Sequence, residues 1–184
     1  MKYSDIYRLY STSQPKDAIH QALREVSVDD SDEQYEDRSP LHLACQYGDT
    51  EGVKILLERD AEPNTKDANG STPIHILGRT SAGRADEDKL KEIAVMLMEH
   101  GANIPRSAKN TTALIECVRN RHFKMAEAII NSGARVNSTD LNGENVLFGF
   151  CAASGDIRRN IRFAKKELDE AVQYRYCLLY TSPS

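Results

Sequence analysis

The sequence contains no tryptophan, and only 7% of its 184 residues are aromatic. It also lacks an excess of positive charge, because the formal net charge is −4 at pH 7. Binding to phosphate backbones depends on a basic surface, so we expect no nucleic acid partner. Hydrophobic residues make up 40% of the chain, which is ordinary for a folded domain of this size.

Long apolar runs are also missing. The first ten residues, MKYSDIYRLY, do not contain the apolar stretch of a secretory signal. No window approaches the roughly 20 consecutive apolar residues that a membrane helix needs. We therefore expect a cytoplasmic, intracellular protein without membrane contact.

The motifs of common catalytic and cofactor sites are absent as well. Four cysteines, at 45, 117, 151 and 177, show no CxxC spacing, and we expect them to be reduced and structural. His42 and Cys45 are three residues apart, but no tetrahedral metal set can be assembled around them. Neither G-x-x-x-x-G-K-[ST] nor G-x-G-x-x-G occurs. The sequence therefore predicts no catalytic residue, no metal and no cofactor.

A repeated motif, by contrast, is clear. In residues 67–77, DANGSTPIHIL, the pair Asn69-Gly70 indicates a tight turn, and Thr72-Pro73 indicates a helix N-cap followed by the first helical residue. The stretch SPLHLA stands 33 residues earlier. In the same frame, residues 56–61 supply a second helix and its end.

This 33-residue period of turn, helix and helix, with T-P-L-H-x-A opening the first helix, resembles the ankyrin repeat. The resemblance covers residues 38 to about 156 and implies an all-α ankyrin-repeat solenoid with β-turn fingers and no true sheet. It divides the chain into a degenerate N-terminal capping repeat with an acidic loop (1–34), three repeats (35–67, 68–106 and 107–139) and a partial fourth repeat (140–176). The last residues, 177–184, resemble translated adapter sequence, and we leave them out of the fold.

Residues that tolerate left-handed backbone support this register. Every aligned turn position and every end of a second helix carries Gly, Asn or Asp, which adopt positive φ at least cost. These positions are Asp37, Gly70, Asn110 and Gly143 in the turns and Asp60, Gly101 and Gly133 at the helix ends. The second repeat is longer than the first by eight residues within residues 81–92, where we expect a surface loop.

Charge is unevenly distributed along the chain. Residues 1–100 carry a net charge of −8 and residues 101–184 carry +4, and six acidic residues lie between Asp29 and Asp37. The acidic run fits either a solvated loop or an acidic lip on a binding surface. We expect a partner with a basic segment near the first repeat and an acidic segment near residues 119–124.

The resemblance implies binding of another protein through the concave surface, that is, through the turn tips and the inward face of the first helices. Matching those variable positions nominates Tyr35, Glu36, Arg38, Gln46, Tyr47, Asn69, Ser71, Arg79, Thr80, Lys109, Thr111, Arg119, Asn120, Asn142 and Glu144. Among them, Tyr35, Tyr47, Arg79 and Arg119 are of the residue types that most often dominate interfaces.

Two other functions stay open. The chain could be the N-terminal recognition region of a longer, truncated enzyme or effector protein. It could also have a structural role, since the uncapped C-terminal repeat could associate with another copy of an otherwise monomeric chain.

Overall fold

The computed structural model describes residues 2–12, 14–80, 86–104, 112–134 and 146. Within these ranges the secondary structure is helical, without a strand. The helices are α1 (Tyr3–Ser11), α2 (Lys16–Glu25), the 3₁₀ turn η1 (Glu33–Tyr35), α3 (Pro40–Gln46), α4 (Thr50–Glu58), α5 (Pro73–Gly78), α6 (Glu87–Glu99), α7 (Ala113–Arg119) and α8 (Phe123–Asn131).

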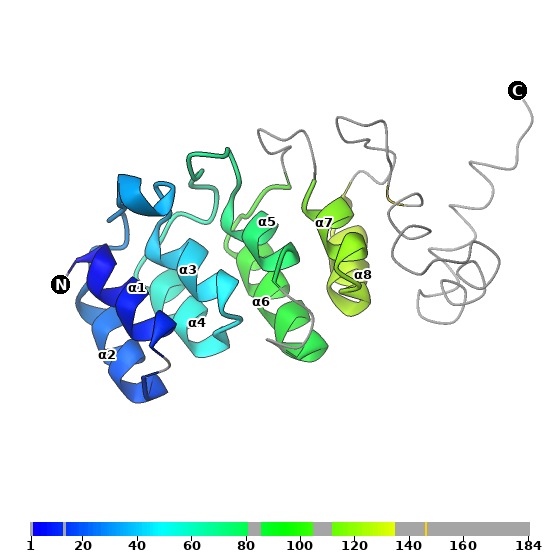
Figure 1. Ribbon diagram of the computed structural model, residues 1–184. Helices are drawn as coiled ribbons and strands as arrows, with labels where there is room; N and C mark the ends of the chain where they lie inside the picture. The colour runs from blue at the N-terminus through cyan, green and yellow to red at the C-terminus, as the bar shows by residue number, and fades with distance from the viewer. Residues whose placement is uncertain (1, 13, 81–85, 105–111, 135–145, 147–184) are drawn as a thin grey trace, which may run out of the picture.

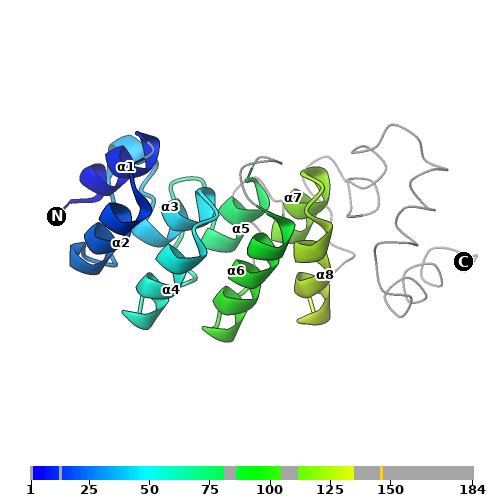
Figure 2. The same ribbon diagram turned by 90° about the horizontal axis from the view of Figure 1, so that it is seen from below.

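The helices form antiparallel pairs that follow one another in a single row (Figure 1). Seen from below, the first helices α1, α3, α5 and α7 make one layer, and the second helices α2, α4, α6 and α8 make the other (Figure 2). Contacts run mainly between neighbours within each layer, such as α3 with α5 and α6 with α8. The predicted all-α solenoid is confirmed.

The T-P-L-H stretches begin their helices as predicted. Ser39 and Thr72 are the N-caps of α3 and α5, and a proline follows each at the first helical position. In both caps the backbone N–H donates to the Nδ1 atom of the histidine three residues on, at 3.1 Å for His42 and 3.3 Å for His75. Each cap therefore satisfies an amide that would otherwise have no acceptor at the helix start.

The predicted left-handed positions are confirmed wherever the structure describes them. Positive φ occurs at Asp37, Asp60, Gly70, Gly101 and Gly133, whereas Asn110 and Gly143 lie outside the described residues. Three further positions also have positive φ, namely Glu36 beside Asp37, and Gly48 and Arg121. Gly48 and Arg121 lie between the first and second helices of their repeats, at a turn that the sequence prediction did not consider.

Buried aliphatic residues and cysteines fill the space between the layers. Cys45 and Cys117 are free thiols with no exposed surface, and burial raises the pKa of both. The prediction of reduced, packed cysteines is confirmed for these two, since a buried thiol with a raised pKa is unreactive. Cys151 and Cys177 lie outside the described residues.

The two N-terminal amphipathic segments are helices, α1 and α2, and they dock on the first repeat through a buried carboxylate. Asp49 accepts a hydrogen bond from the Tyr10 hydroxyl at 2.7 Å. The His20 Nε2 atom lies 3.0 Å from the same carboxylate. Asp49 precedes the first residue of α4, where negative charge is favoured by the helix dipole.

The prediction of a surface loop across residues 81–92 is wrong for its second half. Helix α6 begins at Glu87 and has 13 residues, against nine each in α4 and α8. The Asp86 side chain caps it by accepting the Asp88 N–H at 3.1 Å.

The first turn of α6 also contacts the next repeat. The Glu87 carboxylate accepts from the Lys124 N–H at 3.0 Å and lies 2.9 Å from His122 Nδ1. The added residues therefore continue the helix because they find partners at the start of α8.

The boundaries of the repeats remain predictions. The fourth repeat and the suspected tail lie outside the described residues, except for the buried Val146.

Candidate functional site

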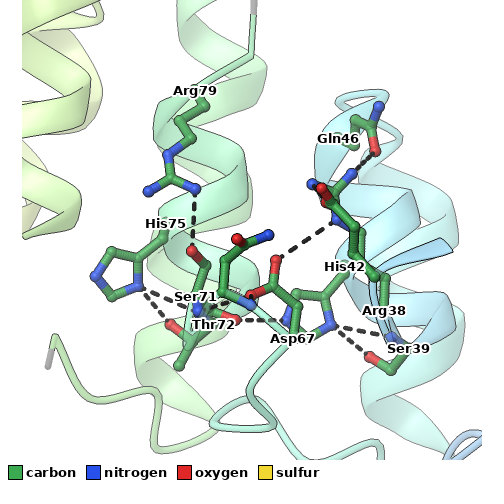
Figure 3. A network of polar contacts seen from close by, with 11 residues as sticks. Arg38, Ser39, His42, Gln46, Asp67, Ser71, Thr72, His75 and Arg79 are labelled. Carbon is green, nitrogen blue, oxygen red and sulfur yellow. Dashed lines mark hydrogen bonds and ion pairs between the residues drawn. The ribbon is translucent and has the colours of Figure 1, made fainter. Parts of the chain in front are cut away.

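The first helices and the turns between repeats carry a continuous set of polar contacts (Figure 3). His42 lies at its centre. Its Nε2 atom lies 3.0 Å from the carbonyl oxygen of Ser71 in the next turn, while its Nδ1 atom accepts the Ser39 N–H. Nε2–H must therefore be the donor, and burial lowers the pKa of His42. The ring is a neutral link between repeats and not a catalytic base.

Asp67 organises the turn that His42 reaches. Its Oδ1 atom accepts the N–H groups of Asn69 and Ser71 at 2.9 and 2.8 Å. Its Oδ2 atom lies 3.6 Å from the Arg38 Nε atom, and the Asp67 side chain has no exposed surface. The carboxylate thus fixes the shape of its own turn and ties that turn to the first repeat.

Arg38 belongs to the first repeat and has two further partners there. It donates to the Gln46 Oε1 atom at 2.9 Å and pairs with Glu36. The guanidinium side chain is 22% exposed. Most of the Arg38 side chain is therefore covered, and a small part of it contacts solvent.

Arg79 repeats this arrangement one unit further along. It donates to the Ser71 Oγ atom at 3.0 Å, and its Nε atom lies 3.2 Å from the Glu116 carboxylate of α7. Together with Arg38, Gln46 and Ser71, these residues form what we call the first-helix polar row. The row extends from the first repeat to the third.

The predicted binding residues differ in exposure. Glu36 is exposed, and the half-buried ones are Tyr35, Arg38, Gln46, Tyr47, Asn69, Arg79, Arg119 and Asn120. Lys109, Thr111, Asn142 and Glu144 lie outside the described residues. Ser71 and Thr80 are buried, and the prediction that they contact a partner is corrected.

Both buried positions hold neighbouring repeats together. The Ser71 carbonyl oxygen accepts from the Asp67 N–H and from His42, which leaves the residue under the turn. The Thr80 carbonyl oxygen accepts from the His122 Nε2 atom at 2.6 Å. Asn120 is likewise engaged, since its amide donates to the Gly78 carbonyl at 3.0 Å.

The two tyrosines that we predicted as interface anchors pack against helix α1. Tyr47 stacks on Tyr10 with ring centroids 4.8 Å apart. Tyr35 lies 4.2 Å from Tyr7 and 5.7 Å from Tyr3, again between centroids. We call these five residues the tyrosine seam. Tyr3, Tyr7 and Tyr10 stand at i, i+4 and i+7 and therefore share one face of α1. This spacing was the sequence signal that could have revealed the seam.

The sequence prediction also missed Glu116. The same place in the first two repeats holds Leu43 and Ile76, so an acidic residue there breaks the apolar pattern. That break was a usable sign of a polar partner, which is Arg79.

Two further features of the described residues bear on the function. Within the described residues, no helix combines the length and apolar character that crossing a membrane requires. The same part of the chain holds no group of three His, Cys, Asp or Glu side chains that could bind a metal ion.

Comparison with known proteins points to one family. The profile described as "Ankyrin repeats (many copies)" matches residues 23–77, and the profile "Ankyrin repeat" matches residues 109–141.

Similar stretches occur in long proteins. The "Transient receptor potential cation channel subfamily A member 1 homolog" of Caenorhabditis elegans is 46% identical over 48 residues, which is 26% of this chain and 4% of that protein. The "Neurogenic locus notch homolog protein 1" of Mus musculus is 35% identical over 108 residues, 58% of this chain and 4% of that protein. The human "Transient receptor potential cation channel subfamily A member 1" is 30% identical over 100 residues, 53% of this chain and 8% of that protein. The chain thus spans less than a tenth of each of these relatives.

Proposed function

Because this chain belongs to the ankyrin repeat family, whose repeats are generally protein–protein interaction modules, we propose that it binds a protein partner through a concave face. That face consists of the first helices and the turn tips, and it has no catalytic chemistry of its own.

The observation that carries this proposal is the first-helix polar row. Arg38 and Arg79 are each held by two or more partners, and the turn between them is fixed by the buried Asp67. Side chains already ordered in the free protein lose little conformational entropy on binding. A partner would therefore meet a surface that does not need to rearrange.

Within that face we assign contact with the partner to residues that keep exposed surface. They are Tyr35, Glu36, Arg38, Gln46, Tyr47, Asn69, Arg79, Arg119 and Asn120, together with the exposed Ala68 at the second turn tip.

The test is capture of partners from a lysate of the source cell, with bound proteins identified by mass spectrometry. Ala68→Arg places a long charged side chain on the turn tip and should abolish capture of the specific partner. The matched control is Ala18→Arg, the same substitution at an exposed position of α2, in the layer of second helices. Both variants should fold normally, since exposed substitutions change stability by less than about 0.5 kcal/mol.

Loss of one protein with Ala68→Arg and its retention with Ala18→Arg would support the proposed face. Equal retention by both variants would show that the partner binds elsewhere. Equal loss would show that capture does not depend on this face.

A second proposal is favoured by the length of the relatives. Matching stretches are 4 to 8% of the proteins named above, which favours a role as the recognition region of a longer protein. Sequencing the complete transcript tests this proposal. A reading frame that continues into a further domain would support it, and one that stops within the repeats would contradict it.

A further inference from the structure

The tyrosine seam lies where helix α1 meets the first repeat. Tyr3 and Tyr10 are almost fully buried, whereas Tyr7, Tyr35 and Tyr47 keep part of their surface exposed. A seam that only closed the core could use leucine or isoleucine. Tyrosine instead brings polarisable aromatic surface to the boundary with solvent.

An acidic segment, residues 29–37, crosses the same place and contains η1. Three of its six carboxylates hold local structure. The Asp30 carboxylate accepts the Tyr3 N–H at 2.7 Å, Asp32 accepts the Gln34 N–H at 2.9 Å, and Glu36 pairs with Arg38.

The other three carboxylates, on Asp29, Glu33 and Asp37, have no ionic or hydrogen-bonding partner among the described residues. Asp29 and Glu33 are exposed and Asp37 is half-buried. The segment therefore carries three carboxylates that its own local contacts do not require.

One polar group under the seam is also unsatisfied. The Tyr3 side chain is 1% exposed, and its hydroxyl has no hydrogen-bond partner in the described part of the chain. Burial raises the pKa of this phenol, and the charged groups that act on it are Arg38 and Asp32. A buried hydroxyl without a partner is uncommon in folded proteins, so this one is open to a hydrogen bond with a group that enters the seam.

Aromatic faces next to unpaired carboxylates match the chemistry of a planar cation. A guanidinium group stacks on tyrosine rings and also donates paired hydrogen bonds to carboxylates. We propose that the tyrosine seam and the acidic segment bind an arginine-containing basic segment of a partner protein. This inference rests on the proposed function and specifies the chemistry of the partner near the first repeat.

The same features disfavour other occupants. An acidic segment would be repelled by the free carboxylates. An apolar helix would bury Glu33 and Asp37 without partners, which costs free energy. Lysine offers a compact, strongly hydrated charge and cannot stack as a plane, so arginine fits this surface better.

The test uses a fluorescein-labelled peptide, GSRGSRGSR, and measures its affinity by fluorescence polarisation. The same peptide with citrulline at the three arginine positions keeps the shape and removes the charge. A third peptide has lysine at these positions. The arginine peptide should bind most tightly, the lysine peptide less tightly, and the citrulline peptide should not bind measurably.

Two sets of variants locate the site. Glu33→Gln combined with Asp37→Asn should weaken binding about fivefold, since two attractive charges are lost. Glu51→Gln combined with Glu58→Gln changes the net charge equally on exposed positions of α4 and should weaken binding less than about twofold.

The aromatic part is tested at Tyr35. Replacement by phenylalanine should leave affinity within about twofold, whereas leucine should reduce it about fivefold, because cation–π attraction needs the ring and not the hydroxyl. If Tyr35→Leu fails to fold, the carboxylate variants still decide the question.

An equal loss of affinity in the two double variants would mean that only general charge attraction acts, and it would overturn the proposal. Binding of the citrulline peptide, or no binding of the arginine peptide, would overturn it too. These failures would leave the proposed function standing if Ala68→Arg still abolished capture. Loss of the proposed function would instead show as indifference of capture to that variant.

Discussion

At the scale of the residue, His42 shows how one side chain joins two parts of the fold. Its ring caps α3 through Ser39 and holds the following turn through the Ser71 carbonyl. Both bonds use the neutral ring with hydrogen on Nε2. Because the site is buried, a second proton would add an unpaired charge.

This geometry predicts a pH dependence. Burial lowers the pKa of His42 below its usual value of 6.5, so the unfolded chain takes up a proton that the folded chain refuses. The free energy of unfolding should therefore hold its full His42 contribution above about pH 6.5 and fall below it, by up to about 1.4 kcal/mol per pH unit. Urea unfolding at pH 7.5 and 5.5 measures the total effect.

Since His20 and His122 also face carboxylates, imidazole ¹⁵N NMR isolates His42. Its ring should start as the neutral form protonated on Nε2 and take up its second proton at a lower pH than free histidine in the same tube. A folded-state His42 that is protonated at the same pH as free histidine, or at a higher pH, would contradict the prediction.

At the scale of the element, helix α5 packs closely against helix α7 because α5 ends in a glycine, Gly78. A Cβ atom at Gly78 would lie 3.1 Å from the Ala113 carbonyl oxygen and 3.2 Å from the Cys117 Sγ atom of α7. The space therefore suits glycine alone, unless α7 moves.

We expect Gly78→Ala to lower the free energy of unfolding by about 1 to 3 kcal/mol through overpacking, although alanine is the better helix former by about 1 kcal/mol. Urea unfolding measures the change. Cys117→Ala removes one of the crowded atoms, so adding it to Gly78→Ala should cost less than the sum of the single changes. A more stable Gly78→Ala protein would show that α7 adjusts freely.

At the scale of the whole molecule, each helix pair contacts mainly its neighbours. In such a stack, damage at one end spreads with decreasing effect toward the other. The bond between the Tyr10 hydroxyl and the buried Asp49 joins the N-terminal pair to the rest.

Tyr10→Phe removes this bond alone and leaves the carboxylate with one donor fewer, which should cost about 1 to 3 kcal/mol. Amide hydrogen exchange should then show a large loss of protection in α1 and α2 and a small one in α7 and α8. The control is Tyr7→Phe, because the Tyr7 hydroxyl makes no hydrogen bond with the described residues. Uniform loss along the chain would indicate a fully cooperative unit instead.

The repeat unit could be predicted from sequence because its signals are local. A helix cap, a proline at the first helical position and a residue suited to positive φ act within a few residues of chain. They placed α3 and α5 and the left-handed positions correctly. The prediction was wrong where the deciding contacts come from another repeat, as at Glu87, which continues a helix because His122 and Lys124 offer it partners.

The candidate site likewise depends partly on local signals and partly on contacts between repeats. The sequence by itself determined the family, the period and the positions that lie on the turn tips and the first helices. Only the tertiary structure decided that Ser71 and Thr80 are buried and that Tyr35 and Tyr47 cover helix α1. The physical reason is that the exposure of a side chain depends on how closely the neighbouring repeat packs against it. That packing is decided by side chains that are distant in sequence.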